Sequence, residues 1–340
     1  MVSVFAPVNI AWIKYMGKED GRPTNASLSM TLDQIGSWTE MWVTSREKKS
    51  VGPEWTWNSM GYVPPEEGIQ KAEQFLSRPE FAELLKQFGI EAKIPAFQVE
   101  ITTRNNVPAA TGIATSASGF AALTLAWLGI LAGDQSRKWK ELFASNVEVK
   151  QAVAKLSGLG SGSACRSFMG PFVEWDPKQG VSAVQSEMVR FVDLIILLES
   201  EPKKVSSSEA HLRVKTSPLF AGRVKRANER LTLVKRDLKN GSIAGLAHTV
   251  LEEALDMHEL FHTSKPPFSY WSEESKRWID LIRYRDKSLP DNQAILTLDA
   301  GANVHLFVER AELARWEGFL TDQKVSFLKA GAGEGARYVD

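Results

Sequence analysis

The chain contains 340 residues, of which 43% are hydrophobic, and its 41 basic and 41 acidic side chains leave no formal net charge. This balance argues against a general affinity for nucleic acid or for an anionic membrane surface. The single cysteine, Cys165, excludes an internal disulfide framework and any cysteine-rich metal site. The longest apolar run, residues 120–132, is shorter than the ~20 residues that span a bilayer. We therefore expect a cytoplasmic protein with two domains or one divided core, whose partner is neither nucleic acid nor a membrane.

The first ninety residues alternate between strand-like and polar segments. An apolar segment at 2–13, interrupted by Pro7, predicts strand structure that ends in a polar turn with two ammonium groups, Lys14 and Lys18. The elements expected after this turn are a hydroxyl-rich loop at 23–27, strands at 37–43 and 55–61, and helices at 66–76 and 79–88.

A small-residue stretch at 105–119 follows a predicted strand and precedes the apolar run. Such a loop lets backbone N–H groups approach an anion, and the positive end of the helix dipole favours phosphate there. An empty, tight strand-to-helix turn explains the stretch equally well. The stretch is not a Walker A loop, because no Gly-Lys-Ser/Thr follows its glycines, and it is not a dinucleotide fingerprint, because its glycines are spaced differently.

The remaining elements mix helices and strands without strict alternation. Helices are expected at 134–145 and 147–156, a second small-residue segment at 158–167, and a strand at 172–175. The charged turn at 176–180 predicts a boundary between domains 1–180 and 181–340. The elements expected beyond it are strands at 191–199, 294–298 and 304–309, and helices at 217–240, 243–260, 272–283 and 311–320. This order favours an α+β architecture.

Three sets of polar residues are candidates for chemistry. His258, Glu259 and His262 fit a zinc-hydrolase pattern, but no other histidine stands at the spacing of the longer motif, and prolines follow closely. Asp299 follows an apolar strand and precedes a sharp turn, which suits a catalytic acid or a plain turn former. Arg166 lies among glycines and serines and could bind a carboxylate or phosphate, or form a structural salt bridge.

Five segments together resemble one family, the diphosphomevalonate decarboxylases of the GHMP kinase superfamily. They are APVNIAWIKYMGK (6–18), PTNASLSMTL (23–32), NNVPAATGIATSASG (105–119), GSGSACRS (160–167) and DAGAN (299–303). The resemblance implies the two-lobed GHMP kinase fold. Its N-terminal lobe, expected over 1–180, resembles ribosomal protein S5 domain 2 and carries the phosphate-binding loop. The α/β C-terminal lobe, expected over 181–340, carries the catalytic aspartate, and the active site lies in the cleft between the lobes.

The resemblance also implies the reaction, in which ATP phosphorylates the 3-hydroxyl of (R)-5-diphosphomevalonate before phosphate and carbon dioxide leave. The product is isopentenyl diphosphate, an isoprenoid precursor of the mevalonate pathway. ATP and Mg²⁺ are the implied cofactors, and a homodimer is the implied assembly.

By similarity, Asp299 is the catalytic acid, Lys14 keeps it ionised, and Asn9 and Arg166 hold the substrate carboxylate and hydroxyl. Tyr15, Lys18, Ser161 and Ser163 are expected at the 5-phosphoryl groups. Ser116 is expected at Mg²⁺. The implied ATP-binding residues are Asn106, Pro108, Gly112, Ala114, Thr115, Ser116, Ser118, Ser206 and Ser207.

The chain departs from the family pattern at several positions near the expected site. Met16 stands where tryptophan is usual, Glu19 where a basic residue is common, and Ala302 where proline is common. Ala210 and His211 replace a usual Gly-Met pair. Since Glu19 reverses a charge beside the expected 5-phosphoryl site, a phosphomevalonate decarboxylase or a mevalonate-type 3-kinase of the same fold stays open. A zinc hydrolase using His258, Glu259 and His262 is the remote alternative.

Overall fold

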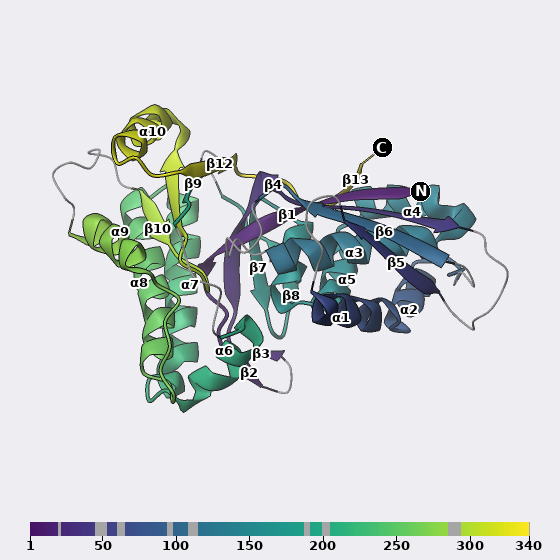
Figure 1. Ribbon diagram of the computed structural model, residues 1–340, viewed down its shortest axis with the longest axis horizontal. Coiled ribbons are helices and arrows are strands. Elements are labelled where there is room, and N and C mark those ends of the chain that lie inside the picture. The colour runs from purple at the N-terminus through teal and green to yellow at the C-terminus, as the bar shows by residue number, and fades with distance from the viewer. Residues whose placement is uncertain are drawn as a thin grey trace.

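The computed structural model describes residues 1–19, 22–44, 53–59, 65–93, 98–107, 115–186, 191–198, 205–284 and 294–339. Within these residues the chain forms two lobes of mixed helix and sheet, as Figure 1 shows. This arrangement confirms the α+β, two-lobed fold expected from the sequence.

The first lobe is built on a seven-stranded sheet whose main path is β13-β1-β4-β6-β5. β7 pairs with β4, and β8 pairs with β7. The strands are β1 (Val2–Ile13), β4 (Ser27–Thr44), β5 (Glu54–Ser59), β6 (Gln98–Asn105), β7 (Phe172–Asp176), β8 (Gly180–Ala183) and β13 (Arg337–Val339). A separate hairpin joins β2 (Lys18–Glu19) to β3 (Arg22–Pro23).

The apolar helix α3 (Thr115–Leu131) is the central helix of this lobe. Almost all of it is buried because it packs against β1 and β4 as well as the neighbouring helices. A helix that is apolar on all sides belongs in a core. The surrounding helices are α1 (Glu66–Leu76), α2 (Glu80–Gln87), α4 (Ser136–Ser145) and α5 (Val147–Ser157).

The second lobe has a four-stranded sheet in the order β10-β11-β9-β12. Its strands are β9 (Phe191–Ile196), β10 (Ile295–Thr297), β11 (Val304–Glu309) and β12 (Phe327–Gly331). Its helices are α6 (Ser207–Arg213), α7 (Arg223–Asn240), α8 (Ile243–His262), α9 (Glu273–Arg283) and α10 (Leu313–Asp322).

An aromatic cluster joins the two lobes at Trp12, which is fully buried near the end of β1. Its ring meets Phe172 of the first sheet at 5.0 Å between centroids, and Phe191 and Phe307 of the second sheet at 5.6 and 5.2 Å, all edge to face. Such contacts add to the free energy of burial. The residues after Trp12 therefore enter the space between the lobes from a fixed point.

Several element boundaries differ from the sequence expectation. β1 continues through Pro7, because the β1–β4 register shifts between Pro7 and Asn9, where a missing backbone donor is tolerated. The helix expected from Ser217 begins at Arg223, because the short 3-10 turn Phe220–Gly222 comes first and the Ser217 hydroxyl bonds to Leu219 N and Thr263 Oγ1 instead of capping the helix. The predicted end at Gly241 is confirmed by its left-handed φ of 70°.

The predicted domain boundary lies at the turn between β7 and β8, and β8 still belongs to the first sheet. β13, which the sequence did not predict, also pairs with β1 in that sheet. No single helix among the described residues has the length and apolar character of a membrane span, although the bent pair 115–131 and 133–145 passes a test of length and composition.

Candidate active site

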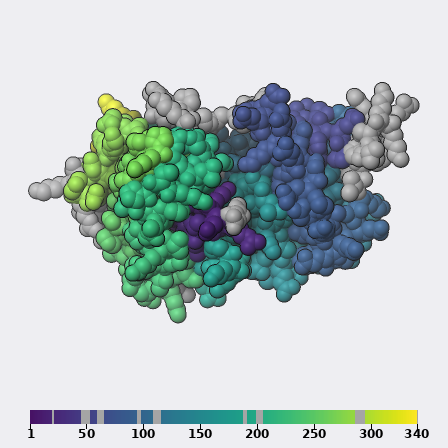
Figure 2. Space-filling view, turned by 90° about the horizontal axis from the view of Figure 1, so that it is seen from below, coloured from purple at the N-terminus to yellow at the C-terminus, as the bar shows by residue number. Residues whose placement is uncertain are grey.

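A cavity of about 410 Å³ lies between the lobes. In Figure 2 the purple surface of the first residues lies between the green second lobe and the blue helices of the first. Among the described lining residues, four cations face one carboxylate, Asp299. These cations are Lys14, Lys18, Lys71 and Arg166. Such an excess of positive charge in a recess between low-dielectric walls favours a ligand with several negative charges.

Asp299 and Lys14 form an ion pair at the cavity wall. Asp299 follows β10, and Gly301 N donates to its carbonyl oxygen at 2.8 Å, which fixes the turn. Lys14 Nζ lies 2.5 Å from Asp299 Oδ1 and 2.6 Å from the Ala11 carbonyl oxygen. Lys14 is buried, whereas the Asp299 side chain is 23% exposed. Both residues line the cavity, and the Asp299 carboxylate is the more accessible partner of the pair.

The charges around Asp299 keep it ionised. Burial alone would raise the pKa of this carboxyl, but Lys14, with help from His305 and Arg166, holds it below its ordinary value. Burial also lowers the pKa of Lys14, and Asp299 opposes that shift. A carboxylate that stays ionised can orient a substrate hydroxyl or accept its proton.

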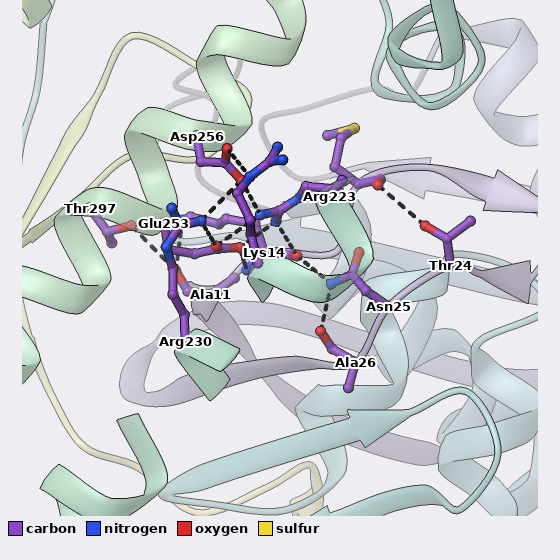
Figure 3. A network of polar contacts seen from close by, with 12 residues as sticks. Ala11, Lys14, Thr24, Asn25, Ala26, Arg223, Arg230, Glu253, Asp256 and Thr297 are labelled. Carbon is purple, nitrogen blue, oxygen red and sulfur yellow. Dashed lines mark hydrogen bonds and ion pairs between the residues drawn. The ribbon is translucent and has the colours of Figure 1, made fainter. Parts of the chain in front are cut away.

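Lys14 is itself held by a buried ion cluster, shown in Figure 3. Its backbone N–H donates to Glu253 Oε1 at 2.9 Å, and its carbonyl oxygen accepts from Arg223 Nη2 at 2.8 Å. Arg223 and Glu253 pair with each other, and both are fully buried. Asp256 and Arg230 extend the cluster toward solvent. The backbone of Lys14 is thus tied to α7 and α8.

Arg166 is a buried guanidinium that has only neutral partners among its described hydrogen bonds. It lies on the 3-10 helix 162–168. Its Nε donates to Asn9 Oδ1 at 3.2 Å and Ser29 Oγ at 3.1 Å, and its Nη1 donates to Ser27 Oγ at 2.8 Å. Burying a charge without a paired counter-ion is costly. A carboxylate or phosphate in the cavity would supply that counter-ion.

Asn9 supports Arg166 from behind the cavity wall. It is buried, and its Nδ2 donates to the Ser163 carbonyl oxygen and to Ser167 Oγ. Asn9 is not among the residues that line the cavity. In this structure it contacts Arg166 rather than facing the space for a substrate.

Tyr15, Lys18, Ser161 and Ser163, the four residues expected at the 5-phosphoryl groups, all line the cavity. Burial raises the pKa of Tyr15, so its phenol stays protonated and can donate a hydrogen bond. The segment 161–163 passes close to the Tyr15 hydroxyl, and this approach requires glycine at position 162, since a Cβ there would lie 2.7 Å from the Tyr15 oxygen.

The expected ATP-binding residues fall into three groups. Thr115, Ser116 and Ser207 line the cavity, the first two at the start of α3. Three other expected ATP-binding residues do not line the cavity. Ser118 is buried against Ser37, and Asn106 forms hydrogen bonds with the backbone of Gly36 and Gln34. Ser206 caps α6, because its hydroxyl accepts from Glu209 N. Pro108, Gly112 and Ala114 lie outside the described residues.

The zinc-hydrolase pattern is not assembled into a metal site. His258 is fully buried and stacks on Trp271, while His262 contacts the edge of the same indole ring and lies beside Ser269. No group of three metal-ligating side chains occurs in the described parts of the chain. The two histidines, which share a helix face because they are four residues apart, pack around Trp271, so the zinc hypothesis is wrong for these residues.

Several lining residues were not predicted from the sequence. They include Lys71, Ser208, Met257 and Ala300, as well as His211, which had been noted only as a departure. Lys71 lies on α1, with its ammonium 5.2 Å from the centre of the Phe120 ring. The sequence around Lys71 is that of an ordinary solvent-exposed lysine on an amphipathic helix, so nothing in the sequence marked it as a cavity residue.

Comparison with known proteins identifies the family. A family model described as diphosphomevalonate decarboxylase-like N-terminal domain matches residues 6–186. The chain belongs to this family. A second model, described as mevalonate 5-diphosphate decarboxylase C-terminal domain, matches residues 193–327.

Relatives of known sequence and structure agree with this membership. The diphosphomevalonate decarboxylase of Debaryomyces hansenii is 31% identical over 322 residues, which cover 91% of this chain and 79% of that protein. A mevalonate diphosphate decarboxylase from Legionella pneumophila has a TM-score of 0.78 at 29% identity, covering 96% of this chain and 99% of its own. The protein MDDEF, solved in complex with MVAPP, AMPPCP and magnesium, has a TM-score of 0.79 at 28% identity, covering 100% and 98%.

Proposed function

We propose that this member of the diphosphomevalonate decarboxylase family converts (R)-5-diphosphomevalonate to isopentenyl diphosphate with ATP. The observation that carries the proposal is the buried Arg166, whose described partners are neutral, in the same cavity as the Lys14–Asp299 pair. The substrate has a carboxylate that can bind Arg166 and a tertiary hydroxyl that can contact Asp299. Its diphosphate suits the remaining lysines of the cavity wall.

In this proposal Asp299 orients the 3-hydroxyl and takes up its proton as the oxygen attacks the γ-phosphoryl group of ATP. Phosphoryl transfer depends mainly on positioning and on stabilising charge. Lys14 keeps Asp299 ionised, and the cationic cavity stabilises the negative charge of the transferred group. Loss of that phosphate then leaves an electron-poor carbon, which takes up the electron pair released with carbon dioxide.

Arg166 would hold the carboxylate until it leaves as carbon dioxide. A guanidinium suits this task because its donors match the two oxygens of a carboxylate. Asn9 and Ser29 hold its Nε and Ser27 holds its Nη1, so Nη2, which has no partner among the described hydrogen bonds, is available to the ligand. We assign Asn9 to positioning Arg166.

The start of α3 would bind the phosphates of ATP, with the backbone N–H groups and the hydroxyls of Thr115 and Ser116 at the helix N-terminus. Mg²⁺ prefers oxygen ligands and commonly binds through few protein groups and the phosphates of its substrate. The Ser116 hydroxyl fits that requirement as one ligand. When bound, the ion would neutralise charge on the nucleotide phosphates.

The diphosphate is favoured over a monophosphate because Glu19 does not line the cavity. Its side chain is exposed on β2, whereas Lys71 adds a cation to the wall. Burial, with a smaller effect of the nearby Lys71, lowers the pKa of Lys18. Two cations that repel each other gain most from a ligand with two phosphoryl groups.

The assembly is implied by the family resemblance. We propose a cytoplasmic homodimer, and light scattering on the purified protein tests the dimer. A monomer at micromolar concentration would rule it out.

Carbon dioxide release from mevalonate, its 5-phosphate and its 5-diphosphate, each with ATP and Mg²⁺, tests the function. We expect release only from the 5-diphosphate at physiological concentrations. Release mainly from the 5-phosphate would establish the monophosphate enzyme, and ADP without carbon dioxide would establish a 3-kinase.

A further inference from the structure

His211 is a polar residue of the cavity wall that has no role in the proposed reaction so far. It lies on α6, is 7% exposed and lines the cavity. Its ring stacks on that of Tyr15, with 4.4 Å between centroids and 26° between planes. The imidazole is therefore held in one orientation by an aromatic residue of the same wall.

The proton of this ring has a defined position. Gly17 N–H donates to His211 Nδ1 at 3.1 Å, so Nδ1 must present a lone pair. A neutral imidazole with an accepting Nδ1 carries its proton on Nε2. Gly17 itself is fixed, since its φ is 106° and a Cβ there would lie 2.6 Å from the Phe220 ring.

The ring is neutral at physiological pH. Burial, with a smaller effect of Lys18, lowers the pKa of His211 to about 3. Nδ1 is used by Gly17, whereas Nε2 has no partner among the described residues and is not among their buried unpartnered atoms. The one free donor of His211 is thus accessible in a wall that also carries Lys18.

We propose that His211 is a specificity-determining residue that donates from Nε2 to a 5-phosphoryl oxygen of the substrate, beside Lys18. This inference rests on the proposed function for the identity of the ligand. Phosphoryl oxygens only accept hydrogen bonds, so an uncharged donor with a fixed tautomer contributes direction, while Lys18 contributes charge. A thioether at this position, as in the family's usual Gly-Met pair, has no proton to donate.

Two substitutions separate donation from packing. His211→Gln puts an amide N–H near the position of Nε2, whereas His211→Asn retains a polar group only near Nδ1. Leu212→Ala, on the same helix and 65% exposed in the parent, is the matched control. Hydrogen bonds to charged groups predict that His211→Asn raises the KM for 5-diphosphomevalonate about 10- to 100-fold. His211→Gln and Leu212→Ala should stay within about threefold, with the KM for ATP unchanged in all three.

Calorimetric titration of the ester without ATP repeats the comparison independently of turnover. We expect His211→Asn to lose the same factor in affinity as in KM. Equal losses in both His211 variants would show that the ring only packs on Tyr15 and would overturn the inference, as would unchanged ester binding or a loss confined to ATP. If the parent binds the ester but releases no carbon dioxide, the proposed function fails and the titration still decides the role of His211. If the parent binds no ester, both fail.

Nitrogen NMR of histidine-labelled protein gives a further readout. We expect the His211 signal at pH 6 to be that of a neutral ring with its proton on Nε2. An imidazolium signal, or a proton on Nδ1, would contradict the proposed donor.

Discussion

Replacing Glu253 by glutamine tests whether the buried ion cluster sets the position of Lys14. Glu253 and Arg223 are both fully buried, and Glu253 also accepts the Lys14 backbone N–H at 2.9 Å. Removing one partner of a buried pair costs about 3–5 kcal/mol, because a charge is left uncompensated. Asp256 Oδ2 stays 2.7 Å from Arg223 Nη1, so we expect the lower end, about 3 kcal/mol, in urea unfolding of Glu253→Gln.

The double variant Arg223→Met with Glu253→Leu separates stability from catalysis. Replacing both charges by apolar groups of similar size is often neutral or stabilising, whereas the buried Lys14 N–H left without its acceptor costs about 1–3 kcal/mol. The double variant should therefore be no less stable than Glu253→Gln. Turnover should not return, because the Lys14 backbone loses a donor and an acceptor that no apolar group replaces. We expect kcat at least ~10-fold below the parent, since small misplacements of catalytic groups have large effects.

An exposed pair on α7 provides the control. Lys225 and Glu229 are 3.9 Å apart and largely exposed, so Glu229→Gln should change stability by less than about 1 kcal/mol and leave kcat unaltered. A loss below about 1 kcal/mol in Glu253→Gln would refute the energetic argument. Parent-like turnover in the double variant would refute the positioning argument.

Three further predictions concern the cavity wall. Asp299→Asn should keep ATP affinity, measured by fluorescence titration, but lose about 10²- to 10⁴-fold in kcat, as expected for a general base; near-parent turnover would remove Asp299 from that role. Arg166→Lys, which keeps the charge but not the paired donors, should raise the KM for 5-diphosphomevalonate about 10-fold or more, and an unchanged KM would show that Arg166 does not bind the substrate. Because the folded-state pKa of His211, about 3, lies below its ordinary 6.5, the unfolded state binds the proton first as pH falls through 6.5, and the parent should lose about 2 kcal/mol of stability at pH 5 relative to pH 8 from this residue. His211→Gln, measured by urea unfolding at both pH values, should lack this part of the pH dependence, and an identical slope would contradict the shift.

The periodic elements of the fold were predictable because each has a local cause. α1 begins and ends at the predicted residues, and the left-handed Gly241 terminates α7 as expected. β13 was not predicted, because three residues are too few to show an alternating pattern of apolar and polar side chains. They form a strand because they pair with the edge of β1. Ser217 has the residue type of a helix N-cap, but its hydroxyl lies 2.7 Å from Thr263 Oγ1, a contact 46 residues away that no local pattern contains.

The part of the site that could be predicted is the part that the order of the family motifs identified. Lys14, Arg166 and Asp299 belong to it, and the structure brings all three to one cavity. The same reasoning placed Asn9 against the substrate, whereas its side chain contacts Arg166. Arg223 and Glu253 were missed because charged residues at helical spacing predict a solvated face, whereas the packing of α7 on α8 and the contact with Lys14 are tertiary features that no local pattern contains.

The return of the chain to β1 has a mechanical consequence. The backbone passes from the first sheet to the second between β8 and β9, and passes back between β12 and β13. Two covalent crossings, together with the packing of Trp12 on both sheets, link the lobes, so the pairing of Lys14 with Asp299 across them does not depend on one connection alone.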